Sequence, residues 1–217
     1  MNSMEQARFN MVEQQIRPWD VLDMTVLDLL KKIKREHFVP AEQRALTFMD
    51  MDIPLGYGAK MWQPKLEARA VQALKLQPSD QVLEIGTGSG YLTALLCSLA
   101  GHVTSVEIVK ELSAAAGRNL AAGRIDNVTL EIGDAANGWG TGPYDAIVLT
   151  GSVPLQPAAL MKNLKVGGRL FAVIGDAPAM QATLVTRTAE DAFHSTTLFE
   201  ISVAPLLNAP QPDRFVF

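Results

Sequence analysis

The chain has 217 residues, of which 48% are hydrophobic and 19% charged, a balance typical of one soluble globular domain. Its formal net charge of −4 argues against nonspecific nucleic-acid binding, which needs clustered Lys and Arg. The single cysteine, Cys97, excludes an internal disulfide and a cysteine-rich metal site. No apolar run is long enough to span a membrane, and the first residues lack an apolar signal core. We therefore expect one cytoplasmic domain that binds neither a membrane nor a metal.

The N-terminal region, residues 1–78, is expected to be helical. Apolar residues recur at helical spacing over 4–16 and 21–35, which predicts two helices. Pro18 separates them, and Asp20 is a candidate N-cap for the second. The second helix carries a run of basic residues that is interpreted as its solvated face: Lys31, Lys32, Lys34 and Arg35.

A different pattern follows this helical pair. A loop rich in Pro and Gly is expected over 38–58, and Pro64 suits the first turn of a third helix that reaches residue 76. The remainder, 79–217, is expected to be a sheet-based core. Its C-terminal tail, 214–217, is apolar and is expected to pack on the domain or on a neighbour.

Strands and helices alternate through this core. Strands are predicted at 82–85, 103–106, 128–132, 146–149 and 169–174, with helices at 91–99, 110–121 and 157–164 between them. Such alternation predicts an α/β fold with a parallel sheet and helices on both faces. Two last segments rich in Val, Thr and Phe, 183–188 and 196–203, predict an antiparallel hairpin at the sheet edge, so that the sheet is mostly parallel and seven-stranded.

The most informative stretch joins the first strand of this core to its first helix. Gly86, Gly88 and Gly90 follow the strand that contains Glu84. Glycines in this place let the backbone turn tightly and approach a ligand closely. A dinucleotide site needs its third glycine one position later, where this chain has Tyr91, so that interpretation fails. Thr87 and Ser89 complete the loop, which taken alone could be only a turn.

Two acidic residues strengthen the prediction of a ligand site. Glu107 ends the second strand, 17 residues beyond Gly90, where a carboxylate can accept hydrogen bonds from both hydroxyls of a ribose. Asp134, flanked by Gly133 and Ala135, follows the third strand. Each alone would be an ordinary strand end or turn residue. Together with the glycine loop they mark the carboxyl ends of three successive strands.

This arrangement resembles the cofactor site of class I methyltransferases, which have a Rossmann-like fold. The resemblance implies S-adenosylmethionine as cofactor, with Asp134 reaching the adenine amino group and neighbouring backbone N–H groups serving the ring. The residues predicted to bind the cofactor are Glu84, Gly86, Thr87, Gly88, Ser89, Gly90, Tyr91, Glu107, Gly133, Asp134 and Ala135.

The chain further resembles the protein-L-isoaspartate O-methyltransferase family over most of its length. The stretches that carry this resemblance are REHFVP at 35–40, PLGYG at 54–58, VLEIGTGSGY at 82–91, YDAIV at 144–148 and LKVGGRL at 164–170. The resemblance implies a class I fold with extra N-terminal helices and a terminal hairpin. It also implies methyl transfer to a carboxylate of an isoaspartyl residue in damaged protein, with a protein or peptide as the substrate.

Two departures from the family pattern fall on the acceptor side. Trp62 stands where the family usually has a serine, and Lys60 stands where it has a threonine; Ser202 takes the place of an arginine. An indole has only a donor nitrogen and is far larger than a hydroxyl. Trp62 therefore either packs to close the pocket or offers an aromatic face to a ligand, and Lys60 either pairs with an anionic substrate or is solvated.

No catalytic residue is assigned, because a carboxylate acceptor is already ionised and needs no general base; Trp62 and Lys60 are the substrate-side candidates. Three functions follow from the sequence. The first is methylation of isoaspartyl residues, made less efficient by the indole at position 62. The second is methylation of a different acceptor, such as a small molecule. The third is noncatalytic binding of S-adenosylmethionine.

Overall fold

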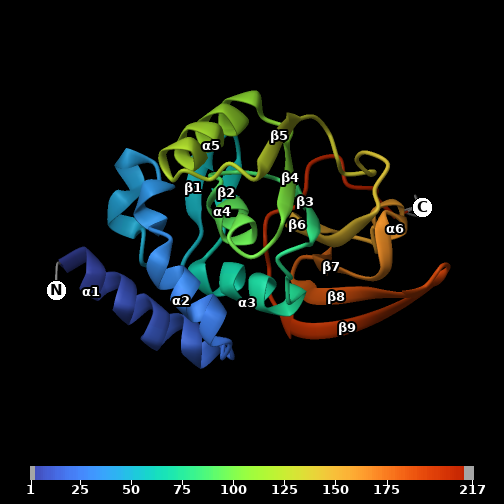
Figure 1. Cartoon of the computed structure of the whole chain (residues 1–217), viewed down its shortest axis with the longest axis horizontal. Coiled ribbons are helices and arrows are strands. Elements are labelled where there is room, and N and C mark those ends of the chain that lie inside the picture. The colour runs from blue at the N-terminus through green and yellow to red at the C-terminus, as the bar shows by residue number, and fades with distance from the viewer. Residues whose placement is uncertain (1–2, 213–217) are drawn as a thin grey trace.

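The computed structural model describes residues 3–212, and Figure 1 shows a central sheet with helices packed against it. Seven strands form this sheet in the order β5-β4-β3-β6-β7-β8-β9. The strands are β3 (Gln81–Ile85), β4 (His102–Glu107), β5 (Val128–Ile132), β6 (Tyr144–Val153), β7 (Leu164–Asp176), β8 (Ala179–Ala189) and β9 (Ala192–Glu200). The first five in that order pair in parallel, and β8 and β9 add antiparallel pairs. The predicted α/β sheet with its C-terminal antiparallel hairpin is confirmed.

Each central strand supplies side chains to two cores, because successive residues of a strand point to opposite faces. Val82 and Val148 lie in one core, together with the N-terminal helices and three later helices. Leu83 and Ile147 lie in the other, with the short helix that precedes β7. The later helices are α3 (Pro64–Leu74), α4 (Tyr91–Cys97), α5 (Lys110–Ala122) and α6 (Ala158–Lys162). Cys97 is buried as expected.

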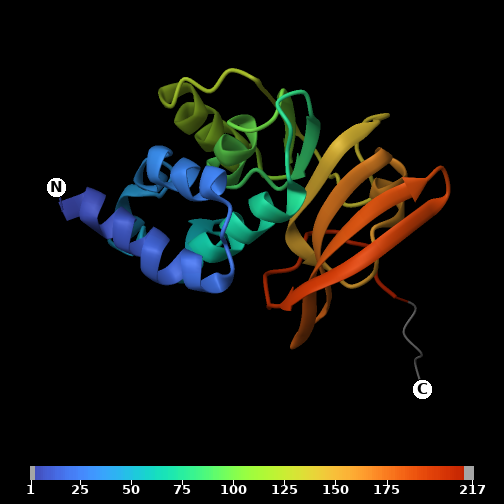
Figure 2. The same cartoon turned by 60° about the horizontal axis from the view of Figure 1, so that its bottom comes forward.

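The N-terminal helices lie beside α3, and the far end of the β8–β9 hairpin projects on the opposite side of the molecule (Figure 2). Helix α1 (Ser3–Asn10) continues into a wider π-helical turn over Met11–Ile16, and α2 (Met24–Lys32) follows. The prediction that Asp20 caps the second helix is wrong. The cap is Asp23, whose carboxylate accepts a hydrogen bond from the Thr25 backbone N–H at 2.8 Å, whereas Asp20 has a φ of 65°.

The expected loop over 38–58 contains structure that the sequence pattern did not predict. Residues Ala41–Leu46 form a 3-10 turn, and β1 (Ile53–Gly56) pairs antiparallel with β2 (Ala59–Met61). The turn between these strands has positive φ at Tyr57 and Gly58, as a two-residue hairpin loop requires. Pro54 weakens the strand pattern in the sequence, because proline has no N–H to donate and is rare inside strands away from sheet edges and bulges.

The interpretation of Arg35 as part of a solvated face is wrong. Helix α2 ends at Lys32, because Ile33 is extended, and the following turn directs the Arg35 side chain into the core, where it is fully buried. Its guanidinium forms an ion pair with Glu67 on α3 and donates to the carbonyl oxygens of Thr47 (3.1 Å) and Trp62 (2.5 Å). It also lies 4.9 Å from the centre of the Tyr91 ring.

This arginine joins the N-terminal region to the sheet-based core. The larger hydrophobic cluster likewise contains residues from both parts, including Leu30 and Leu95. The proposal that the chain is one domain, with a helical region at 1–78 and a core at 79–217, is supported by this shared packing. Within residues 3–212, no helix is long and apolar enough to cross a membrane. The apolar tail at 214–217 lies outside the described residues.

Candidate functional site

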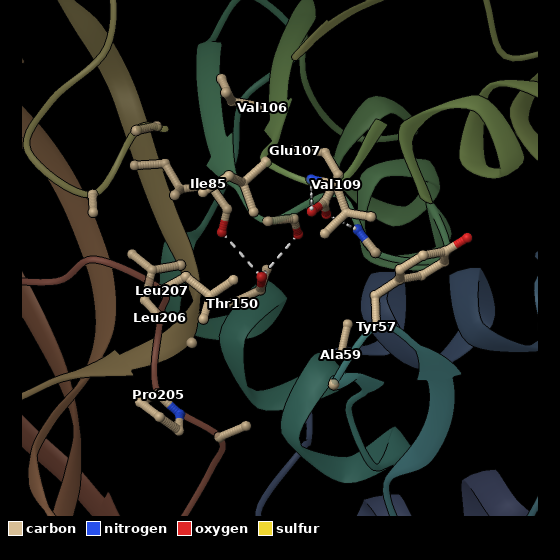
Figure 3. A pocket seen from close by; sticks show the side chains of 18 of the residues that line it. Tyr57, Ala59, Ile85, Val106, Glu107, Val109, Thr150, Pro205, Leu206 and Leu207 are labelled. Carbon is tan, nitrogen blue, oxygen red and sulfur yellow. Dashed lines mark hydrogen bonds between the residues drawn. The ribbon is translucent and has the colours of Figure 1, made fainter. Parts of the chain in front are cut away.

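A cleft opens at the carboxyl ends of the parallel strands, the edge of an open α/β sheet where ligands bind. Its unfilled space, including the open mouth, is about 950 Å³, and a smaller pocket adjoins it. Figure 3 shows the cleft between the strand ends, the β1–β2 hairpin with Tyr57 and Ala59, and the segment with Pro205, Leu206 and Leu207. Three parts of the chain that are distant in sequence therefore form one site.

The glycine loop forms the floor of this cleft. The Gly86 N–H donates to the Val106 carbonyl oxygen at 2.8 Å, and the residue has a φ of 94°. The Thr150 hydroxyl lies 2.8 Å from the Gly86 carbonyl oxygen and 3.0 Å from that of Ile85, as the dashed lines in Figure 3 mark. A Cβ at position 86 would stand 2.0 Å from the Thr150 Oγ1. This position therefore requires glycine for both its backbone conformation and its space.

Glu107 lies at the end of β4 and is 5% exposed. One carboxylate oxygen accepts a hydrogen bond from the Gly88 N–H at 2.9 Å, and the other accepts from the Val109 N–H at 3.0 Å. These bonds fix the carboxylate against the glycine loop. Because each carboxylate oxygen can accept more than one hydrogen bond, the group can still receive two donors from a ligand in the cleft.

Asp134 lies in the loop after β5, beside Gly133 and Ala135, and all three line the cleft. Its Oδ1 accepts a hydrogen bond from the Ala136 N–H at 3.1 Å, and its Oδ2 accepts from the Asn208 side-chain amide at 2.7 Å. The second bond ties this loop to the C-terminal segment. Gly86, Gly88, Glu107 and the loop at 133–135, which the sequence predicted to meet, are therefore brought together.

The other predicted cofactor residues lie around this floor. Thr87 and Ser89 line the adjoining pocket. Gly90, Glu84 and Tyr91 line neither cavity. Gly90 packs against α5, where an added Cβ would approach Ala116 at 3.2 Å, and Tyr91 packs edge-to-face on Phe38. Their direct contact with a cofactor remains a prediction.

Glu84 lies beneath the glycine loop and is fully buried. Its carboxylate accepts hydrogen bonds from the hydroxyls of Thr93 (2.5 Å) and Ser105 (2.6 Å), and the Thr87 hydroxyl lies 2.6 Å from that of Ser105. Burial raises the pKa of the Glu84 carboxyl to about 8, against the opposing effect of these hydroxyls. Glu84 thus supports the loop from below.

Replacement of Glu84 by glutamine is expected to stabilise the protein increasingly as pH rises. The folded chain keeps the Glu84 proton up to about pH 8, whereas the unfolded chain releases it near the usual pKa of about 4.3. Stability from this group is therefore complete in acid and is lost as pH rises toward 8. We expect Tm of Glu84→Gln relative to wild type to rise by several degrees between pH 5 and pH 8, at about 2–4 °C per kcal/mol.

The control for this measurement is Glu42→Gln, because Glu42 is exposed on the surface. We expect its Tm difference from wild type to be the same at both pH values. If the Tm difference between Glu84→Gln and wild type is also the same at pH 5 and pH 8, Glu84 is ionised in the folded protein across this range.

The two substrate-side candidates occupy different environments. Trp62 is 5% exposed and packs edge-to-face on Phe171, with ring centres 6.3 Å apart, yet it also lines both cavities. It is therefore a wall of the site as well as part of the core. Lys60 is exposed on β2 and lines the same two cavities. Ser202 is exposed and lines neither cavity.

Several lining residues were missed from the sequence. Thr150 could have been found, because it follows the predicted fourth strand at the same sheet edge as Glu107 and Asp134. The segment from Ala204 to Leu207 gave no local signal. It reaches the cleft because Pro205 bridges to Ser152 of β6 and Leu206 packs against Gly151. Within residues 3–212, no group of three or more His, Cys, Asp or Glu could hold a metal.

Comparison with known proteins gives consistent matches along the chain. The sequence profile of the protein-L-isoaspartate(D-aspartate) O-methyltransferase (PCMT) family matches residues 6–210. A protein-L-isoaspartate O-methyltransferase of Rhodopseudomonas palustris (strain ATCC BAA-98 / CGA009) is 41% identical over 201 residues, covering 92% of each chain. Protein-L-isoaspartate O-methyltransferase 1 of strain HaA2 is 38% identical over 214 residues, covering 94% of this chain and 87% of its own.

Solved structures show the same fold. A Plasmodium falciparum protein assigned as a protein-L-isoaspartate O-methyltransferase, in complex with S-adenosyl-L-homocysteine, superposes with a TM-score of 0.77 at 19% identity. The match covers 95% of this chain and 99% of that one. A second structure, a protein-L-isoaspartate O-methyltransferase, also has a TM-score of 0.77, at 24% identity, covering 93% of this chain and 65% of that one.

Proposed function

Since this chain belongs to the protein-L-isoaspartate(D-aspartate) O-methyltransferase family, we propose that its cleft holds S-adenosylmethionine against a carboxylate of an isoaspartyl residue in damaged protein. The chain is an S-adenosylmethionine-dependent methyltransferase of this family. One observation carries the assignment of the site: Gly86, Glu107 and Asp134, which follow three successive strands, line one cleft.

The residues of this cleft fit the cofactor. The Glu107 carboxylate, held by the N–H groups of Gly88 and Val109, can accept both ribose hydroxyls. The Asp134 loop can receive the adenine, whose amino group would share a carboxylate oxygen with Asn208. The Plasmodium falciparum structure of the same fold holds S-adenosyl-L-homocysteine, the demethylated form of the cofactor.

The chain's own residues bind and orient the reactants. When bound, the cofactor supplies a methyl group attached to a positively charged sulfur. No general base is required, because the acceptor carboxylate is ionised near neutral pH. The walls formed by Trp62, Pro205 and Leu206 exclude water, and a less polar site favours a reaction in which two opposite charges disappear.

The test is transfer of a labelled methyl group to an isoaspartyl peptide, compared with the same peptide containing ordinary aspartate. We expect a base-labile methyl ester on the isoaspartyl peptide alone, formed at a low rate because Trp62 replaces the usual small hydroxyl. Glu107→Ala should lower cofactor affinity about tenfold or more, since hydrogen bonds to a charged group contribute about 1.5–3 kcal/mol. Glu111→Ala, exposed on α5, is the matched control.

The outcomes separate the remaining functions. If the label passes from the cofactor only to small molecules of a cell extract, the acceptor is a small molecule and the isoaspartyl assignment is wrong. Cofactor binding measured by calorimetry, with no transfer to any acceptor, would contradict the enzymatic assignment. Unchanged affinity in Glu107→Ala would contradict the assigned cofactor site.

A further inference from the structure

Most of the charged side chains that line the cleft and its adjoining pocket are negative. Those residues are Asp52, Lys60, Glu67, Glu107 and Asp134. Of the residues that the structure describes, Lys60 is the one cation in this lining. Glu67 is already paired with the buried guanidinium of Arg35. A carboxylate that enters from solvent therefore meets a wall that repels it everywhere except near Lys60.

Within the described part of the chain, the carboxylates of this wall have partners, whereas the Lys60 ammonium has none. Glu107 and Asp134 accept the hydrogen bonds described above, and Asp52 accepts from the Gln63 backbone N–H at 3.1 Å. Within residues 3–212, the Lys60 ammonium makes no hydrogen bond or ion pair. Its charge is therefore available to a ligand.

The position of Lys60 also suits an acceptor. It lies on β2 next to the buried Met61, and it lines both the cleft and the adjoining pocket. Trp62, Gly86 and Thr150 are also shared by the two cavities. The lysine thus stands where the proposed cofactor cleft meets the second cavity, which is where an acceptor must approach.

We propose that the Lys60 ammonium binds the carboxylate of the methyl acceptor and selects anionic acceptors. This inference rests on the proposed function, because it concerns the acceptor of the same reaction. An exposed ion pair contributes up to about 1 kcal/mol and a partly desolvated one contributes more. Loss of Lys60 should therefore raise KM for an anionic acceptor about threefold to tenfold.

The chemistry predicts that this loss does not lower kcat. In the transfer, a carboxylate lone pair becomes the new C–O bond and the electron pair of the broken C–S bond remains on sulfur. The negative charge of the acceptor therefore decreases toward the transition state. A cation at Lys60 stabilises the bound acceptor more than the transition state, so it improves binding without accelerating the chemical step.

The experiment compares wild type with Lys60→Met, Lys60→Arg and the control Lys32→Met, an exposed lysine of α2 outside both cavities. For the isoaspartyl peptide, we expect Lys60→Met to raise KM about threefold to tenfold with kcat unchanged or higher. Lys60→Arg should restore KM. Added salt should raise KM of wild type but not of Lys60→Met. The Kd of S-adenosylmethionine should be the same in all four proteins.

A second readout keeps this inference separate from the proposed function. Peptide binding to the protein saturated with S-adenosyl-L-homocysteine is measured by calorimetry. If wild type binds the isoaspartyl peptide without methylating it, the proposed function fails, yet weaker binding by Lys60→Met would still support the lysine's role. Equal KM and equal peptide affinity in wild type and Lys60→Met, or no peptide binding at all, would overturn the inference.

Discussion

Replacement of Gly86 by valine is expected to abolish binding of S-adenosylmethionine. The glycine has a φ of 94°, which a branched side chain adopts only under strain. Its Cβ would stand 2.0 Å from the Thr150 Oγ1, so Thr150 and the loop must separate and the cleft floor must move. We expect the affinity measured by calorimetry to fall at least about 100-fold, which corresponds to a loss of about 2.8 kcal/mol of binding free energy.

The matched control is Gly167→Val. Gly167 has a similar φ of 85°, but an added Cβ meets nothing within 4 Å, and the residue lies outside both cavities. This variant should suffer comparable backbone strain while keeping its cofactor affinity. Replacement of Gly88 by valine should displace the loop less than replacement of Gly86, since the added Cβ would approach only the flexible Leu55 side chain, at 3.3 Å. Unchanged affinity in a folded Gly86→Val protein would contradict the site.

Replacement of Arg35 by methionine is expected to lower the free energy of unfolding by about 3–5 kcal/mol, because it leaves a buried carboxylate without its partner. Arg35 is fully buried, pairs with Glu67 and also binds the carbonyl oxygens of Thr47 and Trp62. Urea unfolding followed by circular dichroism measures this loss. Burial raises the pKa of the Glu67 carboxyl against the opposing effect of Arg35, so loss of the guanidinium raises that pKa further. The unpaired group is then neutralised by a proton more readily than the paired one, and the loss should shrink as pH falls.

Two further variants test the reason for this loss. The double variant Arg35→Met with Glu67→Leu should recover a large part of the stability, because replacement of both charges by apolar groups removes the unpaired carboxylate. Arg17→Met breaks an exposed ion pair with Glu13 and should lower stability by less than about 1 kcal/mol. A loss of that small size in Arg35→Met would show that the buried pair contributes little.

The sheet-based core was predictable because each element has a local signal. Apolar strands, amphipathic helices and the glycine loop at 86–90 follow one another at short range, and strands and crossover helices leave few topologies. The carboxyl ends of β3, β4 and β5 therefore had to meet, which correctly united Gly86, Glu107 and Asp134. The sequence could not tell that Glu84 lies beneath the loop or that Tyr91 packs on Phe38 outside both cavities, because that depends on which way each side chain points.

The remaining features depend on contacts between distant residues. Arg35 is charged and lies in a basic run, and its burial depends on partners that are distant in sequence, such as Glu67, which is 32 residues away. The β1–β2 hairpin is short and contains Pro54, which weakens the strand pattern. The C-terminal segment reaches the site through the bridge from Pro205 to Ser152 and the hydrogen bond from Asn208 to Asp134. Such long-range contacts leave no periodic signal in the sequence.

That last segment has a consequence for synthesis. Ala204, Pro205, Leu206 and Leu207 line the cleft, and Asn208 holds Asp134, but all of them follow β9 in the chain. A ribosome that builds the protein from its N-terminus therefore delivers every strand of the sheet before it delivers this wall. The growing polypeptide can complete its sheet while the cleft is still open on one side, and a full binding site exists only after residue 208 has emerged.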